Sequence, residues 1–450
     1  MESSKQPDTK QEDDFVAPEV SNGCMAQIPP TDIEKQKTRE GEAHFHRLGW
    51  KRLTIVLIVQ SIALGSLGLP AAFASLGMVL GVCACIFFGI TSCYASYTIG
   101  QVKLKFPHVA NYVDMGSLMG RYGTLVFSFF FVSLATLTVG SHCLTGQIAL
   151  STITSSSMCA LIFGVASAII LFLLALPPSF SEMAVLGYID FASIILAIGI
   201  TMVATGAQRV DDVDWSPWPR ENLTFSEGFV ALENIVFAFG FASSQPSFMA
   251  EMHTPEDYLK SIKILCTVET VVYTLTGGII YYLVGDSVQS PALLSAGSTL
   301  SRVTFGVALP VIFISGSINA TAVCKYIHGQ VYKDSVVRYV NTTKGWITWI
   351  GLVALVNLTA WVIAEAIPFF SELLSICAAL FVSGLSFYLP PVMWFRLLKQ
   401  GQWYSQHNLR ASFFNGFVFI SGVIVLICGL YASIVQLVCF PFRPLKIALS

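Results

Sequence analysis

The chain has 450 residues, of which 54% are hydrophobic and only 12% are charged, and its formal net charge is −2. Soluble proteins carry roughly 25% charged residues, so this composition excludes an ordinary soluble domain and indicates an integral membrane protein. No basic patch with interleaved aromatic residues occurs, which argues against a nucleic-acid partner and leaves the lipid bilayer as the expected surroundings.

The first 49 residues are polar and too poor in apolar side chains to fold alone. We therefore predict a disordered cytoplasmic tail over residues 1–49, a transmembrane domain over 50–440 and a short extracellular tail over 441–450. No short apolar region with a cleavage site precedes the first apolar segment, so no signal peptide is expected.

Eleven apolar segments follow in chain order, each long enough for a crossing of about 20 residues. They are continuous apolar runs rather than short alternating ones, which favours an all-α protein over a barrel. The predicted spans are residues 53–75, 78–102, 122–150, 158–177, 183–207, 228–250, 262–285, 303–325, 345–366, 369–391 and 412–438.

The basic residues predict the orientation of these spans, because Lys and Arg concentrate on the cytoplasmic side. With the N-terminus inside and the C-terminus outside, 20 of the 25 basic residues fall in inner segments. The five in outer segments are Arg209, Arg220, Arg302, Arg443 and Lys446.

The first span contains the stretch SIALGSLGLPAAFASLG, residues 61–77. Two explanations fit its small residues. Gly65 and Gly68 would let a neighbouring helix approach closely. They also crowd together with Pro70 near mid-membrane, where irregular backbone is tolerated only beside protein or a water-filled cavity. We expect the second case, a discontinuous helix.

The sixth span holds a second weak point, because Gly240, Ser243, Ser244 and Pro246 fall within seven residues. Discontinuous helices at corresponding positions of two five-helix halves are typical of secondary transporters with inverted repeats. The amides at a half-helix start suit a carboxylate, and unwound carbonyls suit an ammonium group or a cation. Spans one and six together therefore predict a site for an α-amino acid.

Four stretches resemble the amino acid/auxin permease family, and within it the fungal N-type branch of neutral amino acid permeases. They are ALGSLGLPAAF at 63–73, NYVDMGSLMGRYG at 111–123, VFAFGFASSQPSFMAEMHTPEDYLKS at 236–261 and IPFFSELLSICAALFVSGLSFYLPPVMW at 367–394. The resemblance covers about residues 48–440, and Ala63 stands where the family motif has its first glycine. It implies a leucine-transporter-like 5+5 inverted repeat with discontinuous helices 1 and 6 plus an eleventh helix, and symport of neutral aliphatic and aromatic amino acids by alternating access.

The same resemblance implies that the substrate is bound largely by backbone of spans one and six. The residues carried over are Ala63, Leu64, Gly65, Ser66, Leu67, Gly68, Phe237, Phe239, Gly240 and Phe241. The phenylalanines either line the side-chain pocket or pack ordinarily. Apart from His142, no cationic residue lies in the core of spans one, three, six or eight, which favours a neutral substrate.

Ionisable groups inside the membrane are candidates for the coupling ion. The proton-coupling candidates are Asp190, Glu233, Glu269 and His142, and each could instead make only a structural hydrogen bond. A sodium site would use Ser315, Ser317 and Thr321 of span eight. The family's sodium-coupled members carry an asparagine at the place of Val59, so proton coupling is favoured over sodium.

Other features are weaker. Asn222-Leu-Thr224 is a glycosylation sequon in the long outer loop. No cysteine–histidine metal spacing and no cluster of nucleophile, base and carboxylate occurs, so neither an enzyme, a metal nor a cofactor is expected. The alternatives to a plasma-membrane importer are an amino acid sensor that signals through its tail, and a transporter of another amine-bearing metabolite or an exporter from a vacuole.

Overall fold

The computed structural model describes residues 48–155, 158–208, 213–333 and 335–439. The predicted cytoplasmic tail, apart from its last two residues, and the predicted extracellular tail lie outside the described residues.

The described chain is all helical apart from one isolated backbone bridge. Its longer helices are α2 (Trp50–Lys105), α4 (Gly123–Thr154), α5 (Ala160–Leu174), α6 (Phe180–Ala207), α7 (Phe225–Ala238), α9 (Tyr258–Val284), α10 (Ser298–Val331), α11 (Thr343–Ala366), α12 (Phe370–Cys377) and α14 (Leu409–Cys439). The shorter ones are α3 (Tyr112–Ser117), η1 (Phe241–Ser243), α8 (Gln245–Ala250), η2 (Pro255–Asp257), η3 (Gly285–Ser287), η4 (Ala292–Ala296), η5 (Val336–Tyr339), η6 (Ala378–Tyr388), α13 (Leu389–Met393) and η7 (Trp394–Leu398).

Nine helical segments within the described ranges are long and apolar enough to cross a membrane, and α5 is a shorter apolar helix. The core of each predicted span falls within helical structure, with the first two spans both inside α2. This is the architecture of a multi-pass integral membrane protein.

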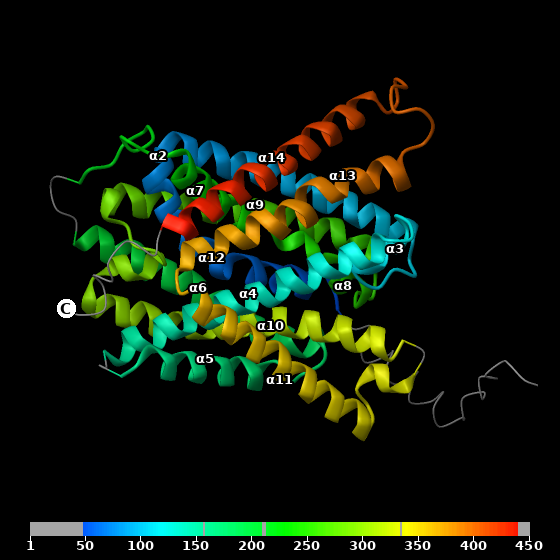
Figure 1. The fold of residues 1–450 in the computed structure, drawn as a ribbon, viewed down its shortest axis with the longest axis horizontal. Helices are drawn as coiled ribbons and strands as arrows, with labels where there is room; N and C mark the ends of the chain where they lie inside the picture. Colours follow the sequence, from blue (N-terminus) through cyan, green and yellow to red (C-terminus); the bar gives the residue numbers. More distant parts are fainter. Residues whose placement is uncertain (1–47, 156–157, 209–212, 334, 440–450) are drawn as a thin grey trace, which may run out of the picture.

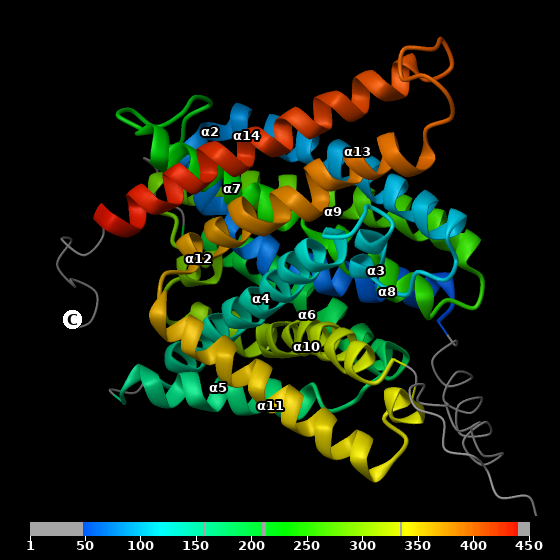
Figure 2. The same ribbon diagram turned by 45° about the vertical axis from the view of Figure 1, so that its right-hand side comes forward.

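The long helices stack side by side with α14 along one edge and α5 with α11 along the opposite edge (Figure 1). α4 and α10 lie between these edges and pack against each other, while α2 packs against α7 and α9. A second view keeps the start of α2 on the side of α8 and the end of α14 at the opposite end of the bundle (Figure 2). The eleven crossings predicted from the sequence, an odd number, would require this separation.

The predicted discontinuity in the first span is wrong. The backbone of α2 keeps helical angles through Gly65, Gly68 and Pro70, and its one non-helical residue is Gly77, with φ of 77° and ψ of 166°. A Cβ at Gly77 would collide with the Trp218 carbonyl. The backbone amides of Met78 and Val79 bond to carbonyls of the loop at residues 216–217, which closes the turn between the two arms of α2.

Close packing explains the small residues of the first arm instead. A Cβ on Gly65 would lie 2.9 Å from both Cα and Cβ of Ala238 and 3.0 Å from the Tyr273 hydroxyl. Gly68 has more room, since its added Cβ would meet the Leu374 side chain at 3.3 Å. Gly65 therefore lets α2 touch the end of α7 directly, which is the use of small residues between membrane helices.

The predicted interruption of the sixth span is confirmed. α7 ends at Ala238, a single 3₁₀ turn occupies Phe241–Ser243, and α8 then runs for six residues from Gln245. Pro246 stands at the start of α8, where its missing amide removes no helical hydrogen bond.

The end of α8 is tied to the residue with which the described chain begins. The Leu48 amide donates to the Glu251 carbonyl at 2.9 Å, and the His253 amide donates to the Leu48 carbonyl at 3.1 Å. Beside this bridge, Lys325 of α10 forms an ion pair with Glu251, whose side chain is 3% exposed. Backbone pairing and a charge pair therefore close the same end of the bundle.

Candidate functional site

A cavity of about 50 Å³ lies at the interruption between α7 and α8. Its walls come from α2, α4, the end of α7, η1, α10 and η6. The lining residues are Ser61, Leu134, Ala135, Thr138, Phe237, Ala238, Gly240, Phe241, Ser243, Ser244, Asn319 and Val382. A volume of about 10–15 Å³ holds one water, so the cavity has room for several ligand atoms.

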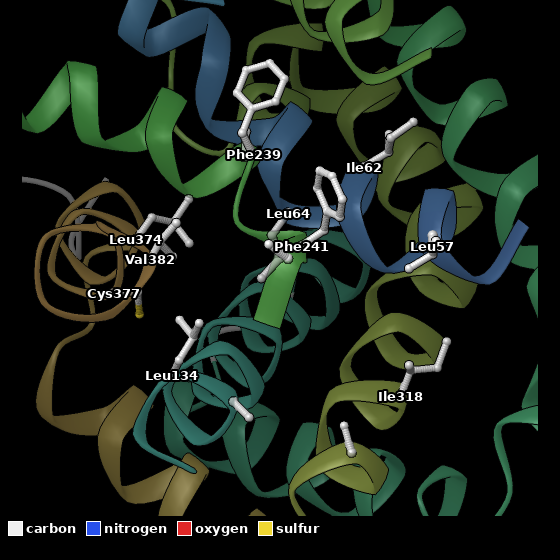
Figure 3. Close-up of a cluster of buried hydrophobic side chains, with 14 of the residues drawn as sticks. Leu57, Ile62, Leu64, Leu134, Phe239, Phe241, Ile318, Leu374, Cys377 and Val382 are labelled. Carbon is white, nitrogen blue, oxygen red and sulfur yellow. The ribbon is translucent and has the colours of Figure 1, made fainter. Parts of the chain in front are cut away.

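The apolar wall of the cavity joins a larger buried cluster (Figure 3). In that view Phe241 lies beside Leu64, with Leu134 of α4 below and Val382 of the neighbouring helix to the side. Val382 belongs to η6, an eleven-residue stretch of π-helix. π-helical turns are rare and occur frequently at functional sites, because they shift side chains relative to a regular helix.

The polar part of the wall is neutral. Five residues supply hydroxyl or amide groups, and no Asp, Glu, Lys, Arg or His is among the described residues that line the cavity: the five are Ser61, Thr138, Ser243, Ser244 and Asn319. Hydroxyls and amides both donate and accept hydrogen bonds. This wall therefore suits a small zwitterion better than a ligand with a net charge.

Three of the predicted substrate residues line the cavity, namely Phe237, Gly240 and Phe241. Phe239 does not, because its ring is fully buried at 5.1 Å from the ring of Tyr273 and its carbonyl accepts a hydrogen bond from Ser92.

The predicted first-span residues lie one or two turns beyond the cavity wall. Leu64 and the four residues that follow it are buried in the bundle, and the side chain of Ala63 lies outside what the structure describes. The predicted members of this group are Leu64, Gly65, Ser66, Leu67 and Gly68.

Sequence reasoning missed Ser61, the residue of the first span that lines the cavity, and it missed Asn319 of α10. Signals for both were present. Ser61 opens the small-residue stretch one helical turn before Gly65, and Asn319 is the one amide in the hydroxyl-rich run of span eight. The three α4 residues gave no signal, because Leu134, Ala135 and Thr138 look like any apolar helix face.

The comparison with known families decides the identity of this bundle. The model of the transmembrane amino acid transporter protein family matches residues 46–435. The chain belongs to this family.

Two relatives span most of this transporter. The N amino acid transport system protein of Neurospora crassa is 53% identical over 410 residues, covering 89% of this chain and 87% of that protein. A transmembrane transporter of Fusarium pseudograminearum is 25% identical over 422 residues, covering 91% of this chain and 89% of that protein.

A solved structure shares the fold. Mhp1, a nucleobase-cation-symport-1 family transporter in a closed conformation with bromovinylhydantoin bound, matches with a TM-score of 0.53. The match covers 87% of this chain and 92% of that chain at 13% identity, so it concerns the fold alone.

Glu269 of the transporter lies directly behind the cavity wall. Its side chain is fully buried in α9, and its Oε1 accepts a hydrogen bond from the Ser61 hydroxyl. The Tyr273 hydroxyl, one turn along α9, donates to the Ser61 carbonyl at 2.7 Å and to the Ala238 carbonyl at 3.0 Å. Glu269 is thus one hydroxyl away from the cavity.

The other proton-coupling candidates make no hydrogen bond to the cavity wall among the described residues. Glu233 accepts hydrogen bonds from Ser375 of α12 and from Ser433 of α14. Asp190 is fully buried in α6, and neither of its carboxylate oxygens has a hydrogen-bond partner among the described residues. His142 of α4 places Nδ1 2.7 Å from the Ile312 carbonyl, which is a structural contact between α4 and α10.

The predicted sodium-site hydroxyls are all buried in α10. Ser317 donates to the Ile314 carbonyl at 2.7 Å, and Thr321 donates to the Ala175 carbonyl at 3.5 Å. The Ser315 carbonyl accepts a hydrogen bond from the Asn319 amide at 3.0 Å. These groups bond to protein, as hydroxyls in membrane helices commonly do.

Proposed function

We propose that this transporter carries neutral amino acids across a membrane by proton-coupled symport. The observation that carries the proposal is the uncharged wall of the cavity, which combines hydroxyl and amide groups with Leu134, Phe241 and Val382. The polar groups suit the ammonium and carboxylate of an α-amino acid, and the apolar groups suit an aliphatic or aromatic side chain. The similarity to a fungal N amino acid transport system protein supports the substrate class.

Buried carboxylates support protons as the coupling ion. Asp190, Glu233 and Glu269 are each fully buried, and none has a basic partner within the described ranges. Unpaired charges are expensive inside a membrane, so such groups are functional candidates when they exchange protons.

We also propose eleven crossings with the N-terminus in the cytoplasm, arranged as two five-helix repeats plus one helix. The nine long apolar segments, the turn of α2 at Gly77 and the shorter α5 support this number. The unequal distribution of Lys and Arg supports the orientation. The plasma membrane is the proposed location, and alternating access would open the cavity to each side in turn.

Uptake of labelled leucine and phenylalanine into transport-deficient cells tests the function. In sodium-free buffer with an inward proton gradient of about 2 pH units, one proton per substrate supports accumulation up to about 100-fold. We expect gradient-dependent accumulation that unlabelled neutral amino acids inhibit and that lysine and glutamate do not.

Binding without flux in protein shown to reach the surface would instead indicate a sensor. Accumulation only with sodium would overturn proton coupling.

The glycosylation sequon provides a test of orientation. Asn222 is exposed in the loop before α7, and its φ of 62° lies in the left-handed region that asparagine and aspartate tolerate. Asn341-Thr-Thr343 also matches the sequon, and the predicted topology places it inside. We therefore expect Asn222→Asp to abolish a glycosidase-sensitive shift on gels and Asn341→Asp to leave the shift unchanged. A shift lost only in the Asn341 variant would show that the orientation is the opposite of the one proposed.

A further inference from the structure

We propose that Glu269 is the proton-binding group of this transporter and that the Ser61 hydroxyl reports its protonation state to the substrate cavity. The inference rests on the proposed proton symport and names the residues that would perform it.

The geometry that distinguishes Glu269 is its bond to a residue of the cavity wall. Ser61 lines the cavity and donates its hydroxyl hydrogen to Glu269 Oε1. The second oxygen, Oε2, is buried and has no hydrogen-bond partner among the described residues. Glu269 therefore has an oxygen available for a proton as well as a direct link to the space where substrate binds.

The other carboxylates lack this link. Glu233 bonds to Ser375 and Ser433, which are not among the lining residues. Asp190 bonds to no lining residue within the described part of the chain. The proton sites predicted from sequence thus differ in their connection to the cavity, although they look alike in burial.

The surroundings of Glu269 contain no compensating charge in the described structure. The titratable groups that face it are Cys266 and Tyr273 on its own helix and Cys93 on the second arm of α2. All three are neutral when protonated, and Glu269 takes part in no ion pair within the described part of the chain. Proton binding is therefore the available way to neutralise this carboxylate inside the bundle.

The Ser61 hydroxyl can signal the change because it both donates and accepts. With Glu269 ionised, the Ser61 hydrogen points to the carboxylate and the Ser61 oxygen presents only lone pairs to the cavity. When a proton from water binds Oε2 and the carboxyl group rotates by half a turn, the new carboxyl O–H can donate to the Ser61 oxygen. The Ser61 hydrogen is then free to turn toward the cavity and donate to a substrate carboxylate.

This exchange couples the two ligands. If protonation turns Ser61 into a donor toward the cavity, a bound carboxylate stabilises the protonated form of Glu269. By linkage, proton and amino acid then raise each other's affinity by the same factor. Symport follows when the two leave together on the other side.

Glu269→Gln is the central test, because glutamine resembles the protonated acid but cannot release a proton. In reconstituted vesicles with an inward gradient of about 2 pH units, we expect leucine accumulation to fall from up to about 100-fold to about the external concentration. We expect exchange of labelled against unlabelled leucine to lose its dependence on pH.

Glu365→Gln is the matched control, since it removes a half-buried carboxylate from α11, outside the cavity wall. This control should accumulate leucine as the unmodified protein does. If Glu269→Gln accumulates leucine as the control does, the assignment of Glu269 is overturned. If the unmodified protein does not accumulate leucine in response to the proton gradient, the proposed proton symport itself is overturned, and the assignment of Glu269 with it.

Ser61 gives an independent test that does not depend on the folding of the Glu269 variant. We expect Ser61→Ala to make the KM for leucine independent of external pH, whereas Ser61→Thr keeps the hydroxyl and the pH dependence. A purely structural role of Ser61 would change the amount of protein without flattening the pH profile. An unaltered pH profile in Ser61→Ala would overturn the role of this hydroxyl.

Discussion

Replacing Gly65 by alanine is expected to reduce leucine uptake by about tenfold or more, whereas Gly68→Ala retains uptake within about twofold. The Cβ added at Gly65 would lie 2.9 Å from backbone and side-chain atoms of Ala238, which lines the cavity. Backbone cannot move aside as a flexible side chain can, so α2 and the end of α7 must separate. Overpacking of this kind costs about 1–3 kcal/mol.

Gly68 supplies the control for this prediction. Its added Cβ would meet the end of the Leu374 side chain at 3.3 Å, and that side chain can rotate. Initial rates of leucine uptake, normalised to surface protein, check both variants. Equal rates in the two variants would show that the contact between Gly65 and Ala238 does not hold the cavity in shape.

Lys325→Met is expected to destabilise the protein by about 3–5 kcal/mol, because it removes the lysine that is paired with a buried carboxylate. The Glu251 side chain is 3% exposed and that of Lys325 is 28% exposed. Breaking one side of such a pair leaves a buried charge without that partner. The measurement is the temperature at which detergent-solubilised protein aggregates.

Two further variants sharpen this test. Lys260→Met removes a pair in which the Lys260 side chain is 60% exposed and that of Asp257 is 31% exposed, so a change of only about 0–1 kcal/mol is expected. The double variant Lys325→Met with Glu251→Gln removes both charges and should recover most of the lost stability. A double variant as unstable as the single one would show that the two side chains act separately.

The interruption of the sixth span could be predicted because its residues leave few alternatives. Gly240, Ser243, Ser244 and Pro246 combine weak helix formers with a residue that lacks an amide. The chain ends α7 at Ala238 and restarts at Gln245, as this pattern predicts. Local propensity and tertiary structure agree here.

The first span shows where such reasoning fails. Gly65, Gly68 and Pro70 suggest a break by the same rules, yet α2 remains helical through all three. The reason is tertiary, because Gly65 is required for contact with Ala238, a residue 173 positions further along the chain. A glycine that permits close approach and one that permits unwinding look identical in sequence.

The cavity illustrates the same limit at the level of side chains. Phe237, Gly240 and Phe241 line the cavity and were predicted from the family resemblance, which carries over the segment around the break in the sixth span. Ser61 and Glu269 lie 208 residues apart, and only the packing of α9 against α2 brings the hydroxyl to the carboxylate. Pairing of this kind depends on which helix faces turn toward each other, and periodicity does not reveal it in segments that are apolar all round.

The backbone bridge at Leu48 makes the end of α8 and the start of α2 a single mechanical unit. Leu48 both donates to Glu251 and accepts from His253, so the two backbone segments joined here cannot slide past each other without breaking both bonds. From this bridge α8 runs back over six residues to Ser244 at the cavity wall. The start of α2 is thus bonded through this bridge to the short helix that leads to the cavity wall.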